Sequence, residues 1–229
     1  MQSAVFSESV EMYLKTLAEL DAHQPVAISR LAGRMSVTQV SATEMVKRMI
    51  EQELVGHQPY KGVTLTEKGR EIGYNVIRRQ RLWECFLYQH LKMEWARLYE
   101  LACDLEHATA PEVTTALAAL LGEPAFCPHG NPIPAADGSF SPLGGTPLSD
   151  GQVGQHGQVL AIQARDADVL RYLEARDLLP GRELTLLDIA PMQGPLTLKI
   201  GEKEIALGLQ MAELVIVKIT TDPHLGKQE

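Results

Sequence analysis

The stretch SVTQVSATEMVKRMIEQE, residues 36–53, decides how the first third of the chain folds. Ser36 or Thr38 offers a hydroxyl that can cap the start of a helix. The apolar side chains that follow recur every three or four residues, the spacing of one helical face: Ala42, Met45, Val46, Met49 and Ile50. Residues 27–35 carry a shorter pattern of the same kind, so the two segments together predict a helix-turn-helix.

The segments on either side of this motif complete a winged helix. A helix is expected before it, over residues 7–21. Two short β-prone runs follow it, at residues 54–57 and 63–66, around a turn at residues 59–62. Thr66 can cap the next helix. A hairpin in this place is the wing of a winged helix-turn-helix.

The predicted second helix of the motif carries side chains suited to DNA. A three-helix bundle with a hairpin does not by itself imply DNA binding, but hydroxyls beside two cations favour it. We expect three hydroxyl residues to face the DNA: Thr38, Ser41 and Thr43. We expect three cations to contact phosphates: Lys47, Arg48 and Lys61.

The charge distribution agrees with a local DNA-binding surface. The formal net charge of −8 argues against a protein that coats nucleic acid generally. Residues 27–81, however, hold ten Lys or Arg against five Asp or Glu, whereas the rest of the chain holds 11 against 24. A basic segment on an acidic body fits a local phosphate-binding surface whose affinity falls with salt. A solvated helical face with extra arginines explains the same count.

The remaining two thirds predict a helical module, a linker and a β-barrel. One long helix is expected over residues 66–92, with two more at 98–107 and 111–121. Their apolar surface exceeds what one small domain covers, which favours a dimerisation module. Residues 122–157 shift to Gly, Pro, Ser and Asp, as a linker does. A helix over 166–176 interrupts five short β-prone runs that indicate a small barrel: 158–163, 183–189, 196–200, 204–207 and 214–219.

We therefore expect a multidomain α+β chain. Its domains are a winged helix-turn-helix at 1–74, a helical dimerisation and metal-binding domain at 75–125, a Pro/Gly-rich linker at 126–156 and a β-barrel at 157–222. The three cysteines are an odd number, which favours free thiols or metal ligands over disulfides. No segment is apolar enough to span a bilayer and no signal peptide precedes the first helix, so a cytoplasmic protein without a membrane partner is expected.

One helix face gathers three donors of different kinds. Cys103, Glu106 and His107 are spaced i, i+3 and i+4, so they meet on one side of a helix. Sulfur, oxygen and nitrogen together suit a divalent transition metal better than calcium or magnesium. A Glu-His pair is also common on a solvated helical face. A metalloenzyme or thiol-redox sensor using Cys103 and His107 is the alternative from another class, but no oxyanion-hole glycine loop accompanies the pair.

Several motifs in order resemble the diphtheria toxin repressor family of metal-dependent bacterial transcription regulators. They are EMYL at 11–14, VKRM at 46–49, LTEKG at 65–69, EH at 106–107 and GNPIP at 130–134. The resemblance covers nearly the whole chain, and the barrel resembles the SH3-like, FeoA-type domain of the longer members. It implies a homodimer that binds a palindromic operator and, with Fe²⁺ or Mn²⁺ as corepressor, represses metal-uptake genes.

The resemblance also implies two metal sites in each subunit. The regulatory ligands of the iron-responsive branch fall on Met12, Cys103, Glu106 and His107. Thioether and thiolate are softer donors than carboxylates, which favours Fe²⁺ over Mn²⁺. A second site, as in manganese regulators of the streptococcal type, falls on Glu84, Cys127, His129 and Asp166.

Four positions depart from the family pattern. Gln80 and Tyr99 stand where the diphtheria toxin repressor branch has histidines of an ancillary site, and Val169 replaces a polar ligand there. That ancillary site is not expected to be built in the same way. Glu44 occupies a recognition-helix position usually held by a neutral polar residue. Its carboxylate can accept from a cytosine amino group or simply avoid the phosphates.

Overall fold

The computed structural model describes residues 6–21, 23–58, 60–141 and 143–220. The chain divides into two compact units, each assembled from separate segments. The first unit contains Met1–Gln80, Asp104–Ala116 and Pro134–Phe140. The second contains Arg81–Cys103, Leu117–Ile133 and Ser141–Glu229. No helix of the described residues is long and apolar enough to cross a membrane.

The first unit begins with the three predicted helices, α1 (Glu8–Leu20), α2 (Ile28–Met35) and α3 (Gln39–Glu51). Ser7 caps α1, because its Oγ accepts from the backbone N–H of Val10 at 3.4 Å. Thr38 caps α3, because its Oγ1 accepts from the backbone N–H of Ser41 at 3.2 Å. The predicted apolar stripes form the core between the helices: Leu14, Leu17, Leu31, Ala42, Val46 and Met49 are all buried.

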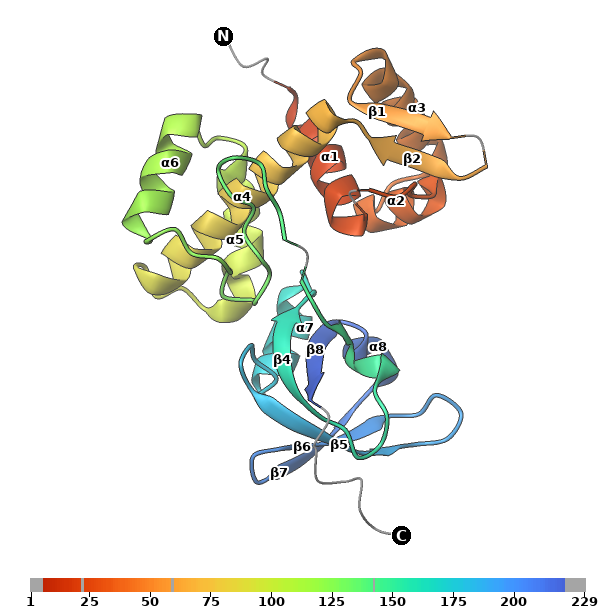
Figure 1. Cartoon of the computed structure of the whole chain (residues 1–229), viewed down its shortest axis with the longest axis vertical. Helices are drawn as coiled ribbons and strands as arrows, with labels where there is room; N and C mark the ends of the chain where they lie inside the picture. Colours follow the sequence, from red (N-terminus) through yellow and green to blue (C-terminus); the bar gives the residue numbers. More distant parts are fainter. Residues whose placement is uncertain (1–5, 22, 59, 142, 221–229) are drawn as a thin grey trace. The chain divides into compact units, whose positions relative to one another are not determined.

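The wing is confirmed as an antiparallel hairpin of β1 (Val55–Gln58) and β2 (Gly62–Leu65) beside α3 (Figure 1). Pro59, which the sequence places in its turn, lies outside the described residues. The long helix α4 (Glu67–Gln89) follows, and Thr66 Oγ1 accepts from the backbone N–H of Gly69 at 3.1 Å as the predicted cap. The fold of this unit is therefore a winged helix-turn-helix.

The helical part of the second unit holds the end of α4 and the 3-10 helix η1 (Trp95–Arg97). The helices α5 (Leu98–Glu106) and α6 (Pro111–Leu120) follow, and each is shared between the units. A small core joins the end of α4 to the end of α6 and the loop after it: Leu82, Cys85, Leu117, Ala118, Cys127 and Ile133.

The C-terminal part of the second unit is the expected small β domain (Figure 1). Its described residues form a six-stranded sheet in the order β3-β8-β4-β5-β6-β7. The strands are β3 (Thr146–Pro147), β4 (His156–Ile162), β5 (Glu183–Ile189), β6 (Leu196–Ile200), β7 (Lys203–Leu207) and β8 (Val215–Thr220). Three short helices accompany them: η2 (Leu148–Asp150), α7 (Ala167–Glu174) and α8 (Leu209–Ala212).

Three elements of this domain differ from the sequence prediction: β3, η2 and α8. The helix η2 lies inside the segment interpreted as a linker. The strand β3 lies inside the segment interpreted as a linker, and its two residues pair with Val217 and Ile216 of β8. The four-residue helix α8 was not predicted either. Each of these elements spans only about one period of the hydrophobic pattern, and β3 contains a proline, so none of them leaves a periodic signal.

Candidate metal sites and nucleic-acid interface

A tight turn after α6 brings Cys127 and His129 to the same side of the chain. The backbone N–H of Gly130 donates to the Cys127 carbonyl at 2.8 Å, and the backbone N–H of Cys127 donates to the Asn131 carbonyl at 2.9 Å. Gly130 has a φ of 80°, and a Cβ there would lie 2.0 Å from the carbonyl oxygen of Leu160. Only glycine therefore fits this close approach to β4.

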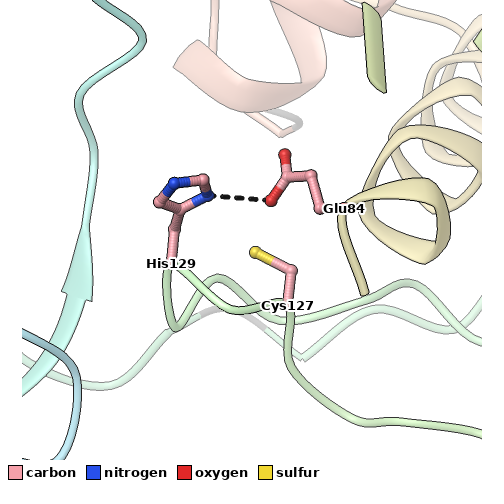
Figure 2. Close-up of side chains that lie close together, drawn as sticks. All are labelled: Glu84, Cys127 and His129. Atoms are coloured by element: carbon pink, nitrogen blue, oxygen red, sulfur yellow. Dashed lines mark hydrogen bonds and ion pairs between the residues drawn. The ribbon is translucent and has the colours of Figure 1, made fainter. Parts of the chain in front are cut away.

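The turn faces Glu84 of α4, and together they form a buried cluster of Glu84, Cys127 and His129 (Figure 2). One candidate ligand atom from each residue lies within 4.8 Å of the others. His129 Nδ1 is 2.9 Å from Glu84 Oε2, and the two side chains are 3% and 4% exposed. Carboxylate, thiol and imidazole converging in a dry site have the composition of a transition-metal site.

The hydrogen bonds of His129 suit a metal ligand. Its Nε2 is 3.1 Å from the carbonyl oxygen of Trp95, which accepts only from an N–H. Nδ1 then faces the Glu84 carboxylate, and a proton or a metal ion has to lie between the two groups. Metal-binding histidines are commonly held in this way, through the ring nitrogen that does not bind the metal.

Burial and charge set the pKa values of this cluster. Burial alone raises the pKa of Glu84, but the charge and hydrogen bond of His129 and the hydrogen bond of Cys127 lower it overall. Burial, with the nearby Glu84 charge, raises the pKa of the Cys127 thiol well above its ordinary value. The thiolate that binds metals is therefore disfavoured here unless a cation compensates it.

The fourth residue expected at the second site, Asp166, lies outside this cluster. It is exposed and acts as the N-cap of α7, where its Oδ1 accepts from the backbone N–H groups of Asp168 and Val169 at 2.9 and 3.0 Å. The structure therefore brings together three of the four predicted residues. Trp95, whose carbonyl orients His129, was not found from the sequence, because a backbone acceptor leaves no signal in residue types.

In the first unit, the end of α5 lies against α1. Lys15 Nζ donates to both carboxylate oxygens of Glu106 at 2.7 Å. Glu11 Oε2 accepts from His107 Nδ1 at 2.7 Å and from Arg79 Nη2 at 2.9 Å. His107 Nε2 is 3.2 Å from Glu106 Oε1. Glu11 and Lys15 were not predicted as site residues; their i, i+4 spacing suggests a pair with each other on the surface of α1.

This arrangement also fits a metal. His107 Nδ1 donates to Glu11 and Nε2 faces Glu106 Oε1, so a divalent metal would take the place of the Nε2 proton between the ring and the Glu106 carboxylate. The hydrogen bonds to Glu106 and Glu11 raise the pKa of His107, against the effect of partial burial. Cys103 is partly exposed and lies one turn before Glu106 on α5. Met12 is partly buried and follows Glu11 on α1.

The positions that depart from the family pattern have other contacts. Gln80 is buried, and its Nε2 has no hydrogen-bond partner among the described residues. The Arg165 guanidinium lies over the Tyr99 ring, 5.3 Å from its centroid. Val169 is held by the Asp166 cap.

The predicted DNA-facing residues lie at the start and along the outer side of α3. Thr38 and Ser41 are exposed, and their hydroxyl oxygens are 3.0 Å apart. Thr43 Oγ1 donates to the Gln39 carbonyl at 2.7 Å. The cations Lys47, Arg48 and Lys61 are exposed, the last of them in the wing.

Part of the basic segment has an internal role. Arg78 is buried and donates to the carbonyl of Pro134 at 2.7 Å, and Arg81 donates to the carbonyl of Pro132. Arg79 pairs with Glu11. The excess of positive charge over residues 27–81 therefore overstates the DNA-binding surface, because these arginines hold other parts of the protein.

Three family profiles match consecutive parts of the chain. Residues 5–63 match "Iron dependent repressor, N-terminal DNA binding domain". Residues 66–135 match "Iron dependent repressor, metal binding and dimerisation domain", and residues 146–219 match the FeoA domain. Together they describe a winged-helix DNA-binding regulator with a metal-binding module and a C-terminal FeoA domain.

Individual relatives agree with these profiles. The diphtheria toxin repressor of Corynebacterium jeikeium is 33% identical over 131 residues, which are 57% of this chain and 55% of that protein. The chain thus matches about half the length of this relative. The diphtheria toxin repressor of Corynebacterium diphtheriae is 26% identical, and the match covers 92% of this chain and 97% of that protein. A solved manganese-dependent transcriptional repressor in complex with manganese has a TM-score of 0.84 and 30% identity, covering 91% of this chain and 98% of its own.

A second solved structure, ScaR with bound Cd²⁺, has a TM-score of 0.80 and 29% identity, with the same coverage of 91% and 98%. The fold, the order of the three matched domains and these relatives agree. The chain belongs to the iron-dependent repressor, or diphtheria toxin repressor, family.

Proposed function

We propose that this chain is a homodimeric, metal-dependent transcriptional repressor with Fe²⁺ or Mn²⁺ as corepressor. The observation that carries the proposal is the contact between the end of α5 and α1 in the first unit. Glu106 and His107, two donors suited to a divalent metal, reach side chains of the helix that leads into the helix-turn-helix. A ligand held there acts directly on the DNA-binding part of the protein.

Met12, Cys103, Glu106 and His107 are the proposed regulatory ligands. A bound divalent cation would supply the charge and the bonds that hold these donors together. Glu11 orients His107 for this role through Nδ1. Because Met12 belongs to α1, its engagement would fix the position of the helix-turn-helix. The ligand can shift that equilibrium only by its differential affinity for the two arrangements, typically about 1–3 kcal/mol.

Glu84, Cys127, His129 and Asp166 are the proposed second site. The first three are already gathered in a buried cluster. Asp166 is exposed, and it would have to break its capping hydrogen bonds to the start of α7 to join them. With the regulatory site, this assignment gives two metal ions per subunit. One proposed ligand of the second site, Asp166, belongs to the FeoA domain.

Apolar side chains exposed in the second unit support the proposed homodimer. They come from the ends of α4 and α6 and from the segments that directly follow these helices: Tyr88, Leu91, Leu120 and Phe126. Isolated exposed apolar residues are ordinary, but four in one small helical module favour an interface. Two winged helices in a dimer would bind the half-sites of a palindromic operator. Such a repressor of metal-uptake genes acts in the cytoplasm.

The alternative, a metalloenzyme or thiol-redox sensor using Cys103 and His107, has less support. The family profiles and relatives are those of repressors. His107 is engaged by Glu11 and Glu106.

The test is binding to a promoter fragment upstream of a metal-transport gene under anaerobic conditions. Fe²⁺ and Mn²⁺ are titrated separately, with a chelator as the control. We expect tight binding with either metal and its loss on chelation, with Fe²⁺ effective at the lower free concentration because of the sulfur donors. Operator binding that is unchanged by the chelator would overturn the proposal.

A further inference from the structure

Lys15 is buried completely, which is rare for a lysine. Its ammonium group lies 2.7 Å from each carboxylate oxygen of Glu106, and both side chains have 0% exposure. The neighbouring α1 residues Leu14, Thr16 and Leu17 are buried as well, so water does not stabilise this charge. The ion pair therefore belongs to the interior of the first unit.

Each buried charge of this pair depends on the other. Breaking a buried ion pair by removing one partner is strongly destabilising, because the remaining charge loses both water and its counter-charge. Glu11, on the same helix, is compensated separately by Arg79. Lys15 is thus a fully buried cation that compensates Glu106 when no metal is bound, beside His107 at 3.2 Å.

The same carboxylate is a proposed ligand of the regulatory metal. Its Oε1 lies 3.2 Å from His107 Nε2. A cation bound by both residues would lie between these two atoms. Both of its oxygens, however, already accept from the Lys15 ammonium. A divalent ion added beside a buried ammonium meets repulsion that the low dielectric of the site strengthens.

We propose that Lys15 is a resident cation that competes with the divalent metal for the Glu106 carboxylate. Lys15 stabilises the metal-free protein and weakens metal binding, and so sets the metal concentration at which the regulatory site fills. When the metal binds, the ammonium gives up at least one of its two bonds to Glu106. This inference rests on the proposed function, because it concerns the same regulatory site.

The test measures Mn²⁺ binding to the full-length protein directly, by calorimetric titration without DNA. Lys15→Met removes the charge and keeps an unbranched side chain; we expect the Kd for Mn²⁺ at the regulatory site to fall about tenfold or more. Lys15→Arg keeps the charge and is expected to bind like the wild type. Lys203→Met, at an exposed position in β7, is the matched control for lost positive charge and should change nothing.

Stability gives a second readout that does not depend on DNA binding. Without metal, Lys15→Met should unfold at a lower temperature than the wild type, because Glu106 is left uncompensated. Mn²⁺ should raise the Tm of this variant more than that of the wild type. If Lys15→Met does not fold without metal, Lys15→Gln replaces it in the titration, since its amide still donates to Glu106 without carrying a charge.

A double variant shows whether the effect acts through Glu106. On a Glu106→Gln background, Lys15→Met should no longer tighten Mn²⁺ binding. Folded Lys15→Met or Lys15→Gln protein with unchanged or weaker Mn²⁺ affinity overturns the resident-cation inference while leaving the proposed function intact. Wild-type protein that shows no Mn²⁺ binding sensitive to His107→Ala overturns both.

Discussion

At the residue scale, each proposed metal site contains a histidine held through the nitrogen that faces away from its carboxylate neighbour. The holding group is the Trp95 carbonyl for His129 and the Glu11 carboxylate for His107. In both cases the other nitrogen points towards a glutamate, Glu84 or Glu106. The two histidine–glutamate pairs therefore share one local arrangement.

Removing the carboxylate of Glu84 should weaken the second site alone. Glu84→Gln keeps the size of the side chain but takes away the negative charge beside His129 and Cys127. We expect Mn²⁺ affinity at that site to fall by about 10- to 100-fold, as for other losses within a metal site. Calorimetry should then show one tight ion per subunit in place of two. Two unchanged tight sites would contradict the assignment, and Asp166→Asn is the matched test of the fourth ligand.

Glu44 should influence which base pair the recognition helix prefers. The residue is exposed on α3, where its carboxylate can accept from a cytosine amino group. Glu44→Gln should shift the preference towards adenine and tighten binding to unrelated DNA, since one repulsion with the phosphates is lost. Binding to operators substituted one base pair at a time measures both effects. An unaltered preference at every position would show that Glu44 only avoids the backbone.

At the scale of elements, α3 and the wing carry the cations proposed to meet phosphates. Lys61→Ala removes one such contact from the wing without touching the core, because the residue is exposed. Because the proposed dimer loses one such contact in each subunit, the slope of log K against log salt should become shallower by about 1.8. Lys203→Ala, on the exposed side of β7, should leave the slope unchanged. Equal slopes for wild type and Lys61→Ala would exclude the wing lysine from the interface.

Most helices and strands could be predicted from the sequence because their signals are local. The caps Thr38 and Thr66 and the apolar stripes are readable along the chain. Elements that span only about one period, such as β3, could not be predicted, because the pattern does not repeat. The candidate sites follow the same rule. The short spacing of Cys127 and His129 in the sequence predicts that both lie in one turn. The contact of Lys15 with Glu106 spans 91 positions, so tertiary packing alone reveals it.

At the scale of the whole molecule, the proposed dimer should depend on the exposed apolar side chains of the second unit. Leu91 is 55% exposed just after α4, and Leu91→Glu introduces a charge without disturbing a buried contact. We expect a weaker dimer by analytical ultracentrifugation and a matching loss of operator affinity. Leu91→Ala should have a smaller effect. A dimer as stable as that of the wild type would exclude Leu91 from the interface.

The central claim is that metal binding and operator binding are one linked equilibrium. Linkage requires each ligand to change the affinity of the other by the same factor. The most direct test is the Mn²⁺ affinity of the wild-type dimer with and without saturating operator duplex. We expect the operator to tighten Mn²⁺ binding by the same factor by which Mn²⁺ tightens operator binding, and His107→Ala to remove both effects. A Mn²⁺ affinity that is the same with and without the operator would contradict the account.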